Sequence, residues 1–205
     1  MRLLVIGAGG HAKVVIDAAR AAGFDVVGVV GRDGDPDELL GVLVTRDASE
    51  LHADAFIVAI GDNASRASTF ATWLDSGLTP ATVIHPSATL AENIVIGRGT
   101  FIAPGVIVNT HAEIGEDAVL NTGCTVDHDC VVGDHAHVGP SVGLCGGVRI
   151  GEGALLGVGS SVIPMGTVGD WAVVGAGAAV VKNVPARSTW GGVPARPLNA
   201  ITDAE

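Results

Sequence analysis

Residues 114–138 read IGEDAVLNTGCTVDHDCVVGDHAHV, and an aliphatic residue opens this stretch and returns at every sixth position. The same spacing continues in both directions and places seventeen aliphatic residues in one unbroken row. A period of six fits neither a helix nor an alternating strand, but it is typical of a solenoid in which each six-residue unit forms one short side. We therefore predict a coil of short parallel strands. The row consists of Ile84, Leu90, Ile96, Ile102, Val108, Ile114, Leu120, Val126, Val132, Val138, Leu144, Ile150, Leu156, Val162, Val168, Val174 and Val180.

Two further rows accompany the aliphatic one. The residue four positions after it is small in most units, as at Ala112, Ala118 and Cys124, and we expect these side chains at tight inner corners. Glycine often follows the aliphatic residue directly, as at Gly115 and Gly133. We expect these glycines where the backbone needs conformational freedom to turn.

The first eighty residues show a different pattern. An apolar run at 3–6 leads into the glycine-rich sequence GAGGH at 7–11, and a helical pattern follows and ends at Gly23. Apolar runs at 26–30 and 55–60 predict two more strands. We therefore expect a small βαβ, Rossmann-like domain over residues 1–80, followed by the coil and a carboxyl-terminal tail over residues 81–205.

A strand, a glycine turn and a helix are the order that a phosphate-binding site needs, because glycines allow close approach and the helix start offers free amides. Eighty residues provide only about half of the sheet that a dinucleotide spans, so a nucleoside diphosphate is favoured. A tight turn without a ligand stays open as an alternative, since Ala12 replaces the third glycine of the usual signature. The candidate substrate-binding residues are Gly9, Gly10, His11, Arg32, Asp33 and Gly61.

Composition and charge narrow the classes of function. The net charge of −11 argues against a nucleic-acid-binding surface, which needs clustered lysine and arginine. The first ten residues read as a strand and a turn rather than a leader, and no run of eighteen apolar residues occurs, so a cytoplasmic location is expected. Three cysteines, Cys124, Cys130 and Cys145, are expected to be thiols rather than parts of a disulfide framework.

Four of the seven histidines lie in the middle of the coil, at His111, His128, His135 and His137, and none falls on the aliphatic row. Asp127 and Asp129 flank His128. His137 follows nine residues later, which is half a coil if one coil takes eighteen residues. The two histidines are therefore expected on different sides of the coil, and a site that uses both is expected in a groove between subunits.

The whole plan resembles the sugar-nucleotide N-acetyltransferases that act on 4-amino sugars and the related sialic acid O-acetyltransferases. The most specific likeness lies in Asn121-Thr122, His128-Asp129-Cys130, Val132-Gly133, His137, Gly146 and the closing GGVPAR at 191–196. The resemblance implies a left-handed parallel β-helix with three six-residue units per coil, so that seventeen units give between five and six coils. It also implies acetyl-CoA as co-substrate, a sugar nucleotide as acceptor, no metal and a homotrimer.

The same resemblance implies roles for individual residues. His128 corresponds to the general base, and Asp129, where relatives often carry the longer glutamate, raises its basicity. Acetyl-CoA is placed near His137 and Gly146, with Val158 and Ala176 along the pantetheine arm, and we extend this set to Lys182 near the phosphates. The chemistry agrees, because acetyl transfer from a thioester to an amine needs a base, and neutral imidazole serves near pH 7.

Other functions are compatible with parts of the pattern. A zinc site of the γ-carbonic anhydrase type would use His111, His128 and His137, but their spacing suits it poorly. Nucleophilic catalysis by Cys145 is a second enzymatic alternative. A sugar O-acetyltransferase and a non-catalytic sugar-nucleotide-binding scaffold also stay open, as do the nucleotide (UDP, GDP, dTDP or CMP) and the acyl chain length. The favoured acceptor is a 4-amino-4,6-dideoxy sugar on UDP or GDP, destined for glycan biosynthesis.

Overall fold

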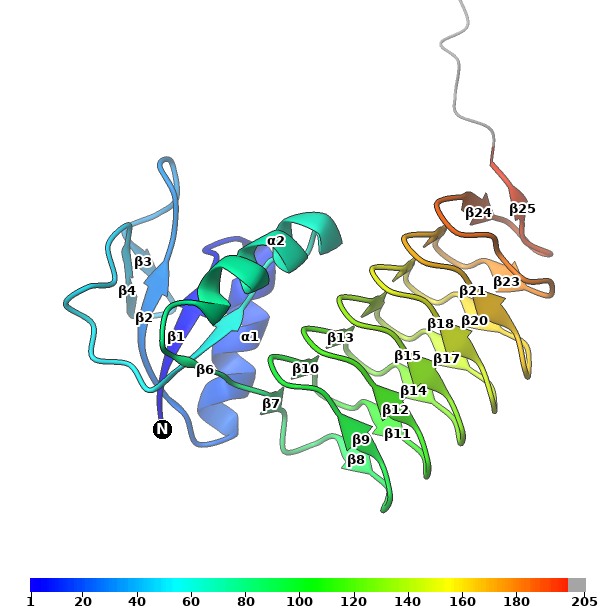
Figure 1. The fold of residues 1–205 in the computed structure, drawn as a ribbon, viewed down its shortest axis with the longest axis horizontal. Coiled ribbons are helices and arrows are strands. Elements are labelled where there is room, and N and C mark those ends of the chain that lie inside the picture. The colour runs from blue at the N-terminus through cyan, green and yellow to red at the C-terminus, as the bar shows by residue number, and fades with distance from the viewer. Residues whose placement is uncertain (199–205) are drawn as a thin grey trace, which may run out of the picture.

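The aliphatic row lines the inside of a parallel coil, which follows a small α/β domain in the computed structural model (Figure 1). The structure describes residues 1–198. Seventeen two-residue strands form the coil, each ends on one residue of the row, and together they stack into three faces. The first face holds β7 (Val83–Ile84), β10 (Phe101–Ile102), β13 (Val119–Leu120), β16 (His137–Val138), β19 (Leu155–Leu156) and β22 (Val173–Val174); the second holds β8 (Thr89–Leu90), β11 (Ile107–Val108), β14 (Thr125–Val126), β17 (Gly143–Leu144), β20 (Ser161–Val162) and β23 (Ala179–Val180); the third holds β9 (Val95–Ile96), β12 (Glu113–Ile114), β15 (Val131–Val132), β18 (Arg149–Ile150) and β21 (Thr167–Val168).

Residues eighteen apart pair between successive coils. Ile84 lies opposite Ile102 in a parallel pair, and Leu120 lies opposite Val138. Three six-residue units therefore make one coil, which confirms the predicted left-handed parallel β-helix. We call the edge between the first and second faces the first edge, that between the second and third faces the second edge, and that between the third and first faces the third edge.

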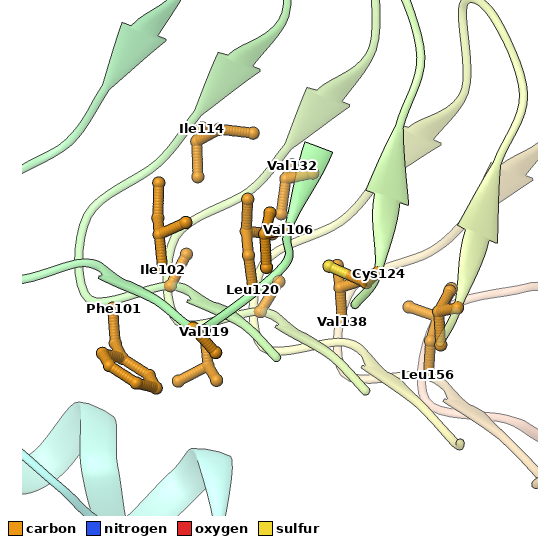
Figure 2. Close-up of a cluster of buried hydrophobic side chains, with 14 of the residues drawn as sticks. Phe101, Ile102, Val106, Ile114, Val119, Leu120, Cys124, Val132, Val138 and Leu156 are labelled. Atoms are coloured by element: carbon orange, nitrogen blue, oxygen red, sulfur yellow. The ribbon is translucent and has the colours of Figure 1, made fainter. Parts of the chain in front are cut away.

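Branched aliphatic side chains fill the interior of the coil. Figure 2 shows Ile102, Leu120 and Val138 inside it, whereas Phe101 points to the other side of its strand. The row residues are fully buried along most of the coil, and the corners between them hold small residues such as Cys124. Burial of this continuous apolar column is the main source of stability in a stacked-repeat fold.

The glycines that follow the row serve close packing rather than turning, which corrects our expectation. A Cβ atom on Gly133 would lie 2.7 Å from the backbone nitrogen of Glu152 in the next coil, so only hydrogen fits there. The turn itself falls two residues later, in the left-handed region that glycine, asparagine and aspartate tolerate best. Asp129 (φ 60°) and His135 (φ 57°) both occupy such turn positions.

The amino-terminal domain is a six-stranded sheet in the order β3-β4-β2-β1-β5-β6 with two helices. The three predicted strands and the predicted first helix occur, but the sequence analysis missed β3, β4 and β6, which are short and extend the sheet on both sides. A side-chain oxygen of Asp62 caps the second helix by accepting from the Ser65 amide at 2.8 Å. The elements are β1 (Arg2–Ile6), α1 (Gly10–Ala21), β2 (Asp25–Val30), β3 (Glu38–Leu39), β4 (Val42–Thr45), β5 (Ala55–Val58), α2 (Asn63–Leu74) and β6 (Thr79–Pro80).

This domain covers the first face of the coil at its amino-terminal end (Figure 1). Helix α1 packs on β7, and the His11 ring lies edge-on to Phe101 with centroids 5.5 Å apart. As a result, the outward-pointing Phe101 and Val119 are buried, whereas the outward-pointing Val95 of the third face is 62% exposed. One face of the coil therefore belongs to the domain contact, and two remain open.

Strand β6 still pairs with β5, and β7 already pairs with β10, so the chain passes from domain to coil at residues 81–82. At the other end, β24 (Thr189–Gly191) extends the first face, and β25 (Arg196–Pro197) pairs with it in antiparallel fashion. Residues 199–205 of the expected tail lie outside the described part of the chain. Within residues 1–198, neither helix has the length and apolar character needed to cross a membrane.

Candidate active site

The first candidate site is a cavity of about 600 Å³ at the carboxyl ends of β1, β2 and β5, which we call the amino-terminal cavity. Parallel sheets bind ligands at this end of their strands, where helix starts also point. Its lining includes residues 7–11, Gly31, Arg32, Asp35 and residues 60–62. The structure thus brings together five of the six candidate substrate-binding residues.

The helix start at Gly9 and Gly10 faces open space. A Cβ atom at either glycine would meet nothing within 4 Å among the described residues, so packing does not require glycine there. No described side chain caps α1, and its first turn carries no acidic residue. The free amides and the positive end of the helix dipole are therefore available to an anion.

Asp33 lies outside this cavity, contrary to our expectation. Its side chain is fully exposed and approaches Arg46 Nε at 3.7 Å. From this turn the lining contains Asp35 instead, whose Oδ2 accepts a hydrogen bond from the Arg32 amide at 2.8 Å; Asp62 supplies a second carboxylate to the lining. The turn between β2 and β3 directs Asp35 rather than Asp33 toward the cavity, and no periodicity in the sequence indicates which of the two faces inward.

His11 and His137 meet where the domain covers the coil, with ring centroids 6.1 Å apart. Asn121 Nδ2 lies 3.0 Å from His137 Nε2, and Asn121 Oδ1 accepts from the Thr122 amide, so the asparagine donates to the ring. The proton of His137 is therefore on Nδ1, which lies 3.4 Å from the Gly61 carbonyl oxygen.

Both of these histidines are held neutral. Burial, followed by the charge of Arg66, lowers the pKa of His11 from 6.5 to about 4. Burial also lowers the pKa of His137 to about 4, with Arg66 and His11 as the next causes. His11 Nε2 is buried and has no hydrogen-bond partner within residues 1–198. This pair can orient a ligand but does not take up a proton near pH 7.

The second candidate site is a cavity of about 570 Å³ on the second edge, which we call the coil cavity. His128 lies at its centre, with its ring above Gly146 of the next coil. A Cβ atom on Gly146 would come within 2.6 Å of His128 Nε2, so glycine makes room for the ring. The lining comprises Asp127, His128, Asp129, Cys145, Gly146, Gly147, Arg149, Pro164 and Met165.

The carboxylate of Asp129 fixes the proton on His128. Asp129 Oδ2 lies 2.7 Å from His128 Nδ1, and because a carboxylate only accepts, Nδ1 carries the hydrogen. The lone pair of Nε2 is therefore free. The bond to Asp129, and next the charge of Asp127, raise the pKa of His128 above its ordinary value. The shorter aspartate at 129 thus reaches the ring at full hydrogen-bond strength.

The candidate acetyl-CoA-binding residues divide between different parts of the coil. Gly146 and Lys182 lie on the second edge with His128, at intervals of whole eighteen-residue coils. Val158 and Ala176 are exposed on the first edge, and His137 lies on the first face beneath the domain. The candidate acetyl-CoA-binding residues therefore do not lie together within one chain. His128 and His137 occupy different sides of the coil, as their half-coil spacing predicts.

The structure bears differently on the two alternatives raised by the sequence, a zinc site and a nucleophilic Cys145. Nowhere in residues 1–198 do three His, Cys, Asp or Glu side chains gather in a group that could hold a metal ion. His111, His128 and His137 in particular do not form such a group. Cys145, in contrast, is exposed and lines the same cavity as His128. It stays a candidate that needs an experiment.

The sequence analysis missed a buried polar cluster at the third edge. Asp117 and His135 lie one coil apart, and His135 Nδ1 donates to Asp117 Oδ2 at 2.8 Å. Arg66 of α2 reaches the same carboxylate at 3.3 Å. The eighteen-residue interval could have paired Asp117 with His135, but no signal in the sequence connects either to Arg66.

A coil of hexapeptide repeats that carries a histidine beside a carboxylate points to the class of hexapeptide transferases. Residues 111–146 match the bacterial transferase hexapeptide family (six repeats), and residues 2–72 match the family described as the PglD N-terminal domain. The second match covers most of the amino-terminal domain, and the first covers part of the coil.

Similar solved structures narrow the class further. Perosamine N-acetyltransferase from Caulobacter crescentus, seen as a histidine variant with CoA and GDP-perosamine, is 39% identical, with 98% of each chain covered and a TM-score of 0.93. The acetyltransferase domain of PglB from Neisseria gonorrhoeae is 33% identical over 96% of this chain and 99% of that one, with a TM-score of 0.89. WeeI from Acinetobacter baumannii is 26% identical over 97% of this chain and 100% of that one, at 0.88. The chain belongs to this family of sugar-nucleotide N-acetyltransferases.

Proposed function

We propose that this chain transfers the acetyl group of acetyl-CoA to the amino group of a 4-amino-4,6-dideoxy sugar carried on GDP. The observation that carries the proposal is the near-complete likeness to perosamine N-acetyltransferase structures with CoA and GDP-perosamine bound, at 39–40% identity. The N. gonorrhoeae domain, which has also been seen with acetyl-CoA, supports the same donor. We favour GDP over UDP because the structures that are 39–40% identical to this chain hold GDP-perosamine.

The amino-terminal cavity suits a nucleoside diphosphate. Its volume of about 600 Å³ matches that of ordinary ligand sites. The uncapped start of α1 at Gly9 and Gly10 would receive the diphosphate, and Arg32 adds a positive charge at the rim. Gly61 and His11 line the side of the cavity nearest the coil, where the sugar would leave it.

The coil cavity supplies the base. During attack of the sugar amine on the thioester carbon, a new C–N bond forms and the nitrogen loses a proton, which His128 Nε2 accepts. The C–S bond then breaks, and the CoA thiolate leaves and takes up a proton. Asp129 stabilises the imidazolium, because its carboxylate accepts from Nδ1 throughout. No acyl-enzyme is needed.

A homotrimer would complete the site. In one chain, His128 is on the second edge, whereas Val158 and Ala176 are on the first edge and the amino-terminal cavity lies over the first face. In such a trimer, the groove between the β-helices of two subunits would bring the second edge of one subunit against the first edge of the next. His128 and Lys182 of one subunit would then face Val158 and Ala176 of another across the bound acetyl-CoA.

We place the reaction in the cytoplasm, in the biosynthesis of a surface glycan. Cys124, Cys130 and Cys145 are free thiols, as expected in a reducing compartment. Acetyl-CoA and sugar nucleotides are the activated forms in which cells hold these groups for biosynthesis.

A thiol-release assay with acetyl-CoA tests the proposal. Its acceptors are a 4-amino sugar on GDP, UDP, dTDP and CMP, together with a sugar that offers only hydroxyls. We expect the fastest release with the GDP-linked amine, retention of activity in Cys145→Ala, and a loss of about 10²- to 10⁴-fold in His128→Ala. Binding of the sugar nucleotide without thiol release would instead support the scaffold hypothesis. Light scattering tests the trimer, and the mass of a single chain at working concentration would contradict it.

A further inference from the structure

Within residues 1–198, Arg66 is the largest fully buried side chain. It lies in the first turn and a half of α2, where the domain meets the coil, and is 1% exposed. A buried guanidinium is costly unless a counter-charge and acceptors surround it. The groups that bond to Arg66 therefore indicate which contacts compensate the free-energy cost of burying it.

The guanidinium bonds to both halves of the molecule. On the coil side, Nε donates to the Asp117 carbonyl at 3.0 Å and lies 3.3 Å from the Asp117 carboxylate, and another amino group donates to the His135 carbonyl. On the domain side, the remaining amino group donates to Asn63 Oδ1 at 2.9 Å and to the Ile60 carbonyl at 3.3 Å.

Asn63 extends the same contact by one coil. Its Nδ2 donates to the carbonyls of Gly153 and Ala154 at 3.0 and 3.2 Å. Asp117, His135 and Gly153 are eighteen residues apart and occupy left-handed turns of three successive coils. The start of α2 is thus bound to three successive coils by hydrogen bonds, whose directions are fixed. Apolar packing alone would let the helix slide along the coil.

This attachment fixes a wall of the amino-terminal cavity. Ile60, Gly61 and Asp62 line the cavity, and they lie between the end of β5 and the attached helix start. The Gly61 carbonyl in that wall is the group that faces His137 Nδ1. A shift of α2 would therefore move the acceptor cavity and the ring of His137 together.

We propose that Arg66 is a positioning residue for acetyl transfer: through Ile60 and Asn63 it binds the Ile60–Asp62 wall of the amino-terminal cavity to the Asp117 and His135 turns, and thereby sets the position from which the bound acceptor reaches the coil. This inference rests on the proposed function, because it assigns the acceptor to that cavity. It predicts an effect on turnover that is separate from acceptor binding and from folding.

The test compares Arg66→Met with Arg98→Met. Arg98 is exposed and pairs with Glu116 at 2.7 Å on the same edge, so its loss removes an ion pair without touching the cavity wall. For Arg66→Met we expect kcat to fall at least tenfold, since a displacement of about 1 Å costs up to about 10²-fold. Binding of GDP should change by less than about threefold. Arg66→Lys, which keeps the charge and one donor, should restore part of kcat, and Arg98→Met should match the wild type.

A double variant guards against loss of the fold. Arg66→Met with Asp117→Asn removes both buried charges, so no unpaired carboxylate remains to destabilise the protein.

In every folded Arg66 variant, long-range nitrogen NMR should show that the Nδ1–H signal of His137 is lost or exchange-broadened. Folded variants with wild-type kcat and an intact signal would overturn the proposal. So would failure of all three variants to fold, which would leave Arg66 a structural role alone. Absence of thiol release in the wild type would instead refute the proposed function, and the His137 signal would still test Arg66.

Discussion

The two histidine sites of this chain have opposite electrostatics. At the domain contact, burial lowers the pKa of His11 and His137 to about 4. On the second edge, His128 is more than half exposed, and Asp129 raises its pKa. The first environment keeps imidazole neutral near pH 7, and the second makes imidazole more basic.

The difference assigns separate tasks to identical side chains. A neutral ring with fixed donor and acceptor atoms orients a ligand, whereas a ring with a free Nε2 and a carboxylate on Nδ1 accepts protons. The fold produces both environments from one coil, by covering its first face with the amino-terminal domain and leaving its second edge open.

The largest expected effect comes from exchanging one histidine at a time for asparagine. His128→Asn should lower kcat by about 10²- to 10⁴-fold with little change in sugar-nucleotide binding, because it removes the proton acceptor. His137→Asn should cost only about tenfold, because it perturbs orientation. Steady-state thiol release measures both. Equal losses in the two variants would break the distinction between the sites.

A smaller effect is expected from Gly146→Ala. The new Cβ would lie 2.6 Å from His128 Nε2 and would displace the ring from above the next coil. We expect kcat to fall by roughly ten- to a hundredfold with an unchanged melting temperature, since the half-exposed ring can move away. Gly143→Ala is the control, because its Cβ would meet only Thr125 Oγ1 at 3.8 Å. Wild-type kcat in Gly146→Ala would show that the ring position is unimportant.

The buried site should appear in the pH dependence of stability. Unfolded histidine takes up a proton near pH 6.5, whereas folded His11 and His137 do so only near pH 4. Between these values the unfolded state binds more protons, so stability falls as the pH falls, by at most about 1.4 kcal/mol per pH unit for each histidine.

Urea denaturation at pH 5 and pH 7 measures this slope. His11→Gln should reduce it, whereas His52→Gln, at an exposed position outside both cavities, should leave it unchanged. An unchanged slope in His11→Gln would mean that this histidine titrates normally in the folded protein.

The smallest expected effect is a shift of the pH–rate profile. The rate should fall as the pH drops through the pKa of His128, because the base must be neutral. Asp129→Asn removes the main cause of the raised pKa, so the acid limb should move to lower pH. Asp127→Asn should move it in the same direction but less far, because its charge is the lesser cause. A shift to higher pH in either variant would contradict the assignment of His128 as base.

Much of the coil follows from counting residues. The period of six gives the strands, and the interval of eighteen places Asp117 beside His135 and Gly146 beside His128. The same count separates Val158 and Ala176 from Gly146 and Lys182, because 158 and 146 differ by twelve. The resemblance to a family groups these residues into one site and implies that two subunits of a trimer contribute them, which stays a prediction.

The contacts between the two halves of the chain could not be predicted in this way. Arg66 and Asp117 are fifty-one residues apart, and no repeat relates a helix of one domain to a turn of another. The exchange of Asp33 for Asp35 in the cavity lining depends on the course of an irregular turn. Both features depend on how elements pack, and packing leaves no periodic signal in one sequence.

Because the coil advances in whole turns of about 4.8 Å, it also acts as a molecular ruler. Arg66 and Asn63 attach to the coils of Asp117, His135 and Gly153. His128 lies within that span, so the proposed base and the amino-terminal cavity are both positioned relative to the same three coils. Lys182 lies three coils beyond His128, or roughly 14 Å. Inserting eighteen residues after Gly166 would leave His128 and the linings of both cavities in register while moving Lys182 one coil further away. The number of coils between His128 and Lys182 therefore fixes the distance from the proposed base to the lysine that we expect near the phosphates of acetyl-CoA.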